Sequence, residues 1–132
     1  PRAPPPPPPQ LPPRLEVERM VMEALRRRDP LLPASWPALV AAAYEDEVDS
    51  VQWLLESRSD PNEVTHSRST ALWHAVSNCN LRMCCLLLEA QADPNHRKKN
   101  SRGTWRGVLD MAVNDGAPES ICRALAAAGA EP

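Results

Sequence analysis

The four cysteines and three histidines are the residues of this sequence best suited to metal binding or nucleophilic chemistry. Their densest group comprises His74, Cys79, Cys84 and Cys85. Structural zinc sites pair cysteines as C-x₂-C, which this group lacks, and adjacent cysteines on a helix point about 100° apart. A Cys–His nucleophile also needs an orienting third group and an oxyanion hole, for which the sequence offers no candidate. We therefore predict no metal, no cofactor and no catalytic residue; a small enzyme or metal protein is the alternative.

Two other patterns associated with enzymes are weak or missing. The four glycines form neither G-x-G-x-x-G nor G-x-x-x-x-G-K, the loops that cradle phosphates. Four acidic residues cluster between residues 45 and 49, at the expected entry to a helix, where carboxylates complement the helix N-terminus. A solvated helix start explains this cluster better than acid–base catalysis. We expect that the chain is not an enzyme.

A basic segment between His96 and Arg106 holds five arginines or lysines and no acid. It also contains a tryptophan, and Arg with Trp is the composition typical of hot spots in protein interfaces. We hypothesise that the segment contacts an acidic protein surface. The alternative is that an inserted loop is charged because it must stay in water. The candidate residues are Arg97, Lys98, Lys99, Arg102, Trp105 and Arg106.

The composition of the 132 residues limits the class of protein. Apolar residues make up 42% and aromatic residues 4%, which favours one helical core over a sheet. The net charge of −2 argues against nucleic acid as a partner. The longest uncharged stretch, residues 31–44, is shorter than the roughly 20 residues of a membrane span. The cysteines lack the spacing of a disulfide framework, so we expect reduced thiols and a cytoplasmic or nuclear location.

The first third of the chain divides into an arm and a helix. Proline dominates residues 1–14, which predicts a disordered polyproline II arm. Apolar residues recur every four positions from Val17 to Leu25, which predicts a helix over residues 15–28 that ends before Pro30. Its last turn holds three arginines, where the helix dipole favours positive charge; a basic recognition patch is the alternative.

From residue 37 onward the sequence repeats at an offset of 33 residues. Residues 37–69 and 70–102 share nine identities, including Leu-Leu-Glu and Asp-Pro-Asn, and a third copy follows with insertions. Each copy predicts a short helix, a tight turn, a longer helix and an extended loop. Helices this short persist only when they stack on neighbours. Because the third copy stops before its Asn, we interpret the chain as an excerpt of a longer protein.

Two motifs of the second copy resemble the ankyrin repeat family. Residues 70–75 (TALWHA) resemble T-P-L-H-x-A, and residues 87–95 (LLEAQADPN) resemble L-L-x-x-G-A-D-x-N. The resemblance covers residues 37–132 as three repeats, the last one truncated, with residues 15–36 as a capping helix and linker. The expected repeat bounds are 37–69, 70–106 and 107–132.

The resemblance implies an all-α ankyrin-type solenoid that binds a protein partner through its loops and concave face. It places the basic segment at the loop edge, where the preceding loop adds the candidates His66 and Arg68. Arg58, Gln91 and Arg68 stand where the family has glycine, which implies left-handed backbone with strain of about 1 kcal/mol at each. The alternative function is a regulatory or targeting segment of a larger enzyme or channel.

The proline arm suggests a second kind of partner. Residues 9–14 match P-x-x-P-x-R through Pro9, Pro12 and Arg14. This pattern resembles ligands of SH3 domains, which bind preformed polyproline II and pair its Arg with acids. Such matches arise easily in any proline run, so a linker or spacer is the alternative.

Overall fold

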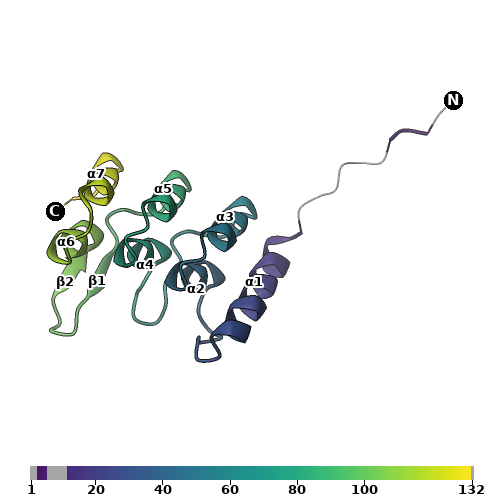
Figure 1. Cartoon of the computed structure of the whole chain (residues 1–132), viewed down its shortest axis with the longest axis horizontal. Helices are drawn as coiled ribbons and strands as arrows, with labels where there is room; N and C mark the ends of the chain where they lie inside the picture. The colour runs from purple at the N-terminus through teal and green to yellow at the C-terminus, as the bar shows by residue number, and fades with distance from the viewer. Residues whose placement is uncertain (1–2, 6–11, 132) are drawn as a thin grey trace.

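The computed structural model describes residues 3–5 and 12–131 of the chain, which holds an ordered stack of helices from residue 14 onward (Figure 1). The elements of this part are α1 (Arg14–Arg28), α2 (Ala38–Tyr44), α3 (Val48–Glu56), α4 (Ala71–Ser77), α5 (Leu81–Glu89), β1 (Arg97–Lys99), β2 (Trp105–Gly107), α6 (Val108–Asn114) and α7 (Glu119–Ala127).

The helices form two rows, which confirms the predicted helical solenoid. The seven-residue helices α2, α4 and α6 pack on one another in sequence, and the nine-residue helices α3, α5 and α7 form a second row beside them (Figure 1). Helix α1 packs on both α2 and α3 and therefore covers the first repeat. The loops that follow the second-row helices project from the same side of the stack (Figure 1).

One continuous apolar core runs through the stack. Leu39 and Leu72 are buried at equivalent positions of α2 and α4, and Leu109 of α6 packs against the same core. The second row contributes the fully buried side chains of Leu54 and Leu87. Because each repeat buries its apolar side chains against the next, the helices support one another in the way that the sequence periodicity predicted.

Backbone at positive φ marks the end of each second-row helix. Arg58 has φ 68°, Gln91 has φ 72° and Gly129 has φ 98° at the same position of the three repeats. Arg68, in the loop before α4, has φ 65°. These values confirm left-handed backbone at the three non-glycine positions. Asp46 and Cys79 also adopt positive φ in the turns between paired helices, where the third repeat has Gly116.

Polar side chains cap a helix start and hydrogen-bond successive loops to each other. The Thr70 hydroxyl accepts a hydrogen bond from the Trp73 N–H (3.2 Å), as expected of an N-cap. The amide of Asn62 donates to Gln91 O (3.2 Å) and its Oδ1 accepts from the Asp93 N–H (2.7 Å). Asn95 makes the same pair of hydrogen bonds one repeat later, to Gly129 O and from the Glu131 N–H. Each loop is therefore fixed to the next.

Three aromatic rings meet where the first-row helices α2 and α4 adjoin. The Trp36 and His74 rings stack with centroids 5.9 Å apart, and Tyr44 meets both rings edge-on at 5.3 and 5.4 Å. Burial, with a smaller contribution from the charge of Lys98, lowers the pKa of His74 to about 4. His74 is therefore neutral at physiological pH and packs as an aromatic ring.

The segment between Asn95 and α6 differs from the plain loop that we expected. β1 and β2 pair as an antiparallel hairpin over residues 97–107. The insertion makes this loop long enough to form two short strands joined by a turn, whereas the shorter loop at residues 63–69 forms no strand. The helical stack is unaffected, so the strands are an addition to the predicted fold.

We expect Gln91→Gly to stabilise the protein. Glycine removes left-handed strain of about 1–2 kcal/mol but loses about 0.5–1 kcal/mol to its unfolded-state entropy, so the free energy of unfolding should rise by about 0.5–1 kcal/mol. Urea unfolding measures this change. The control Ala24→Gly, at an exposed position in the interior of α1, should lower stability by about 1 kcal/mol. A Gln91→Gly variant no more stable than the parent would contradict the strain.

We expect His74 to make stability fall with acidity. Its pKa is about 4 in the folded protein, against an ordinary value of 6.5 for an exposed histidine, so the unfolded chain binds the extra proton between these values. The free energy of unfolding should therefore decrease as pH falls through this window and not change from this cause above it. Urea unfolding across the window should show a shallower pH slope for His74→Gln than for the parent; equal slopes would exclude His74 as the source.

Candidate functional site

The hairpin is shaped by the side chain of Asn100 at its turn. Asn100 Oδ1 accepts hydrogen bonds from the N–H groups of Arg102 and Thr104, each at 2.9 Å. Gly103 in the same turn has φ 82°, a conformation that glycine adopts without strain. The register pairs Arg97 with Gly107, Lys98 with Arg106 and Lys99 with Trp105. The strands therefore place alternate basic residues on opposite faces.

One face of the hairpin carries Lys98 and Arg106, directly opposite each other and both half-buried. Lys98 Nζ lies 2.6 Å from the hydroxyl oxygen of Ser69 and 5.6 Å from the centroid of the Trp73 ring. Because Ser69 is buried and Trp73 belongs to α4, the lysine is held against the helical stack. This face is continuous with the first-row helices.

The other face carries Trp105, and two cations lie near its ring. The ring is 49% exposed, and Arg68 and Lys99 lie over it at 5.7 and 5.8 Å from its centroid. The adjoining His96 places Nε2 2.7 Å from Arg68 O. The structure thus brings Arg68 of the preceding loop together with the hairpin, as the sequence-based site proposed.

The remaining predicted residues lie farther out. Arg97 and Arg102 are exposed on the hairpin, and His66 is exposed in the preceding loop. None of the hydrogen bonds in the described part of the chain joins His66 to the hairpin. Across residues 3–5 and 12–131, the ion pairs involve Arg14, Arg19, Arg28 and Arg123 only, so none of the hairpin cations is neutralised by a carboxylate.

Sequence reasoning missed the ring cluster of Trp36, Tyr44 and His74 as part of this surface. His74 follows Trp73, which contacts the hairpin, and Tyr44 is 49% exposed on the same row of helices. The 33-residue offset could have predicted this cluster. It aligns His74 with Ala41 of the preceding repeat, and Ala41 lies one helical turn before Tyr44. The side chains gathered along the first row are therefore aromatic as well as basic.

The four cysteines differ in burial and lie apart from the hairpin surface. Cys84 is fully buried, and burial raises the pKa of its thiol to about 12, so the nucleophilic thiolate is not populated. Cys122, at the equivalent position of the last repeat, is half-buried, and no disulfide joins the four cysteines. No group of three His, Cys, Asp or Glu side chains in the described ranges is arranged to hold a metal ion.

The acidic cluster at residues 45–49 contacts neighbouring elements. Glu47 pairs with Arg28 of α1 at 2.7 Å, and Asp46 accepts a hydrogen bond from the side chain of Asn80 at 2.8 Å. A hydrogen bond with Asp29, together with burial, raises the pKa of Glu45. These contacts join α1 and the second repeat to the first, which supports the structural interpretation of the cluster.

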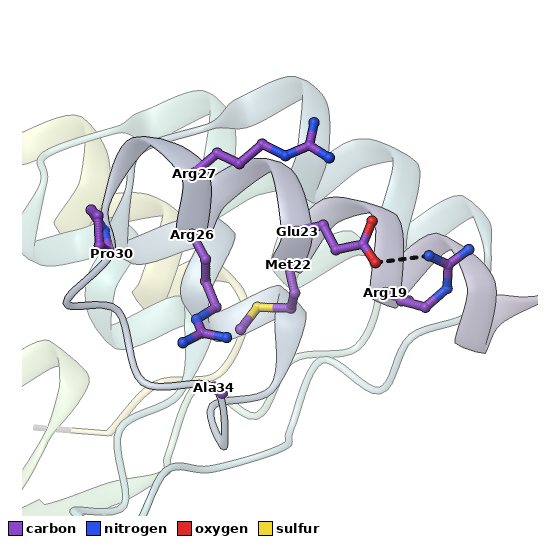
Figure 2. Close-up of a pocket in the computed structure, with 7 residues that line it drawn as sticks. All are labelled: Arg19, Met22, Glu23, Arg26, Arg27, Pro30 and Ala34. Atoms are coloured by element: carbon purple, nitrogen blue, oxygen red, sulfur yellow. Dashed lines mark hydrogen bonds and ion pairs between the residues drawn. The ribbon is translucent and has the colours of Figure 1, made fainter.

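A cavity of about 450 Å³ opens beside α1, at the opposite end of the stack from the hairpin (Figure 2). Three of its charged side chains are engaged within the chain: Arg19 pairs with Glu23 at 2.8 Å, and Arg26 Nε donates to Leu32 O at 3.2 Å. Arg26 lies beside Met22 and points toward the linker (Figure 2). Arg26 thus joins the linker to α1, whereas the Arg19–Glu23 pair lies within the helix, and the hairpin remains the stronger candidate surface.

The proline motif is only partly described. Pro9 lies outside the described residues, whereas Pro12 lies two residues before Arg14, the first residue of α1. Arg14 is the first residue of α1, with its Nε 3.5 Å from Glu18 Oε1. The predicted arm therefore ends one residue earlier than expected, because an ion pair at spacing i,i+4 extends the helix back to Arg14.

No described helix is both long and apolar enough to cross a membrane.

Comparison with known proteins agrees with this geometry. A family model described as ankyrin repeats, in three copies, matches residues 17–98 and 38–132. A putative ankyrin repeat protein of Acanthamoeba polyphaga mimivirus is 32% identical over 75 residues, which cover 57% of this chain and 18% of that protein. The match therefore spans about a fifth of that relative's length. The paired helices, the 33-residue offset and the matched family model together show that this chain belongs to the ankyrin repeat family.

Proposed function

We propose that this chain binds an acidic surface of a protein partner through the edge formed by the hairpin (residues 97–107), the preceding loop (residues 63–70) and the first-row helices. Ankyrin repeats are in general protein–protein interaction modules. The observation that carries the finer proposal is the set of hairpin cations without a carboxylate partner in the described chain. An acidic partner surface would supply the missing counter-charges.

Trp105 supports an anchoring role for this edge. Trp105 is half-exposed, yet Arg68 and Lys99 both contact its ring, which restricts the side chain and lowers the conformational entropy that it loses on binding. Interface hot spots are enriched in Trp and Arg at such positions. The ring therefore offers the partner an apolar contact within a charged rim.

The ring cluster of Trp36, Tyr44 and His74 extends the proposed surface along the first-row helices. Tyr44 exposes about half of its side chain there, at 49%, and its neighbours Trp36 and His74 hold it edge-on. A rigid aromatic side chain with a hydroxyl group combines apolar area with a hydrogen-bonding tip. A partner that contacts the hairpin and the adjacent helix row would cover both groups.

Other roles for the chain have weaker support. An SH3-type ligand would need the Arg14 guanidinium, which here pairs with Glu18 inside α1. The chain covers only part of its relative, so a role as the regulatory or targeting segment of a larger enzyme or channel stays a second proposal. Cysteines without disulfides suit the reducing cytoplasm or nucleus that we propose as its location.

The experiment removes four cations from the hairpin. The variant Arg97→Ser/Lys98→Ser/Lys99→Ser/Arg102→Ser and the parent are used to capture proteins from cell extract at low and high salt, with quantification of each captured protein. Partners of the parent should bind the variant about tenfold more weakly at low salt, because rim charges govern association and its salt dependence.

A matched control carries Arg19→Ser/Arg27→Ser/Arg82→Ser/Arg123→Ser, which removes four exposed arginines from α1, α5 and α7. It should capture the same proteins as the parent, since exposed charges contribute little to stability. Equal loss of capture in the two variants would point to net charge alone. Unchanged capture by the hairpin variant would remove the hairpin from the interface.

A further inference from the structure

We propose that the hairpin face carrying Lys98 and Arg106 binds the phosphoryl dianion of a phosphorylated serine or threonine side chain. This inference rests on the proposed partner-binding function and names the chemical group that the same surface recognises. The site, called the hairpin pocket below, is a cavity of about 250 Å³ lined by Trp73, Lys98, Lys99, Asn100, Ser101 and Arg106.

The hairpin pocket concentrates positive charge without internal compensation. Lys98 and Arg106 are cross-strand partners, and like charges at directly opposite positions destabilise a strand pair. Lys99 also lines the pocket, although its Nζ lies over the Trp105 ring on the other face of the hairpin. No carboxylate of the described residues pairs with any of the three. A bound anion would therefore relieve a repulsion that the free protein retains.

The groups of the pocket are held in place before any ligand binds. Lys98 is fixed by the buried Ser69 hydroxyl and by the face of Trp73. Asn100 Oδ1 accepts from two backbone N–H groups, and none of the hydrogen bonds within the described residues uses its amide nitrogen, which can therefore donate to a ligand. Ser101 adds an exposed hydroxyl group at the turn. Preorganised donors lose little entropy when a ligand binds.

The number and kind of these donors favour a phosphoryl group over a carboxylate. One arginine satisfies a carboxylate through two parallel hydrogen bonds. A phosphorylated serine carries a charge of about −1.5 to −2 and three strong acceptor oxygens, which suits the two cations Lys98 and Arg106 with an amide and a hydroxyl beside them. The Trp73 ring, half-buried at the side of the pocket, can pack against the peptide chain that carries the phosphate.

The test uses a defined probe, so it does not depend on knowing the partner. N-acetyl-O-phosphoserine amide is titrated into the full chain, and amide and indole signals are followed by NMR, with N-acetyl-glutamate amide as the carboxylate comparison. We expect saturable shifts at Trp73, Lys98, Asn100 and Ser101, and affinity for phosphoserine at least about tenfold above that for glutamate. Equal affinity for the two probes would overturn the proposal.

Three variants test where the probe binds. Lys98→Ser/Arg106→Ser should lose the phosphoserine shifts, and the charge-conserving Lys98→Arg/Arg106→Lys should retain them if the folded spectrum is preserved. Arg82→Ser/Arg123→Ser removes two exposed charges from the second row and should bind as the parent does. Binding that survives Lys98→Ser/Arg106→Ser with native signal dispersion would place the probe elsewhere and overturn the proposal.

Two further measurements separate this inference from the proposed function. Phosphatase treatment of the extract should abolish partner capture by the parent. Capture that survives this treatment but is lost in the four-cation hairpin variant would uphold the acidic partner and overturn the phosphoserine site. Phosphatidylcholine vesicles with a small fraction of phosphatidylinositol phosphate test a membrane source. Vesicle binding combined with phosphoserine affinity no better than that of glutamate would favour the membrane and overturn the proposal.

Discussion

The helices of this protein are too short to exist alone, and mutual burial is the interaction on which the rest of the structure depends. The first-row helices have seven residues and the second-row helices nine, whereas isolated helices need about 12–15 residues to be even marginally stable. Leu54, Leu72 and Leu87 have almost no exposed surface because each is covered by the adjacent repeat. The stability of one repeat is therefore inseparable from that of its neighbours.

The loops are ordered because they are attached to this stack of helices and to one another. Asn62 and Asn95 each connect a loop to the backbone of the following one, and Lys98 reaches Ser69 in the previous loop. The hairpin is only two short strands, and an isolated hairpin of that kind is marginal in water. Its contacts with Ser69, Trp73 and Arg68 turn it into a fixed surface, which is what a binding edge requires.

Much of the fold could be predicted because the same sequence motif occurs three times along the chain. The Thr70 cap and the positive φ of Arg58 and Gln91 follow from where these residues fall in the repeat motif. The hairpin has no counterpart in the other repeats, and strand pairing depends on a register that the sequence does not display. Because no strands were predicted, the sequence did not indicate that Lys98 and Arg97 lie on opposite faces of a hairpin. The candidate residues were therefore identified from the sequence, but the pocket was not.

Charge segregation, more than total charge, determines what this surface can attract. The chain has 15 basic and 17 acidic residues, which argues against long-range attraction of any polyanion. Glu47 and Asp46 are engaged with α1 and the second repeat, while the hairpin cations have no acidic partner among the described residues. At physiological salt, charges act over about 8 Å, so a docked partner senses the hairpin and little of the distant acids. A weakly acidic protein can therefore present a strongly basic site.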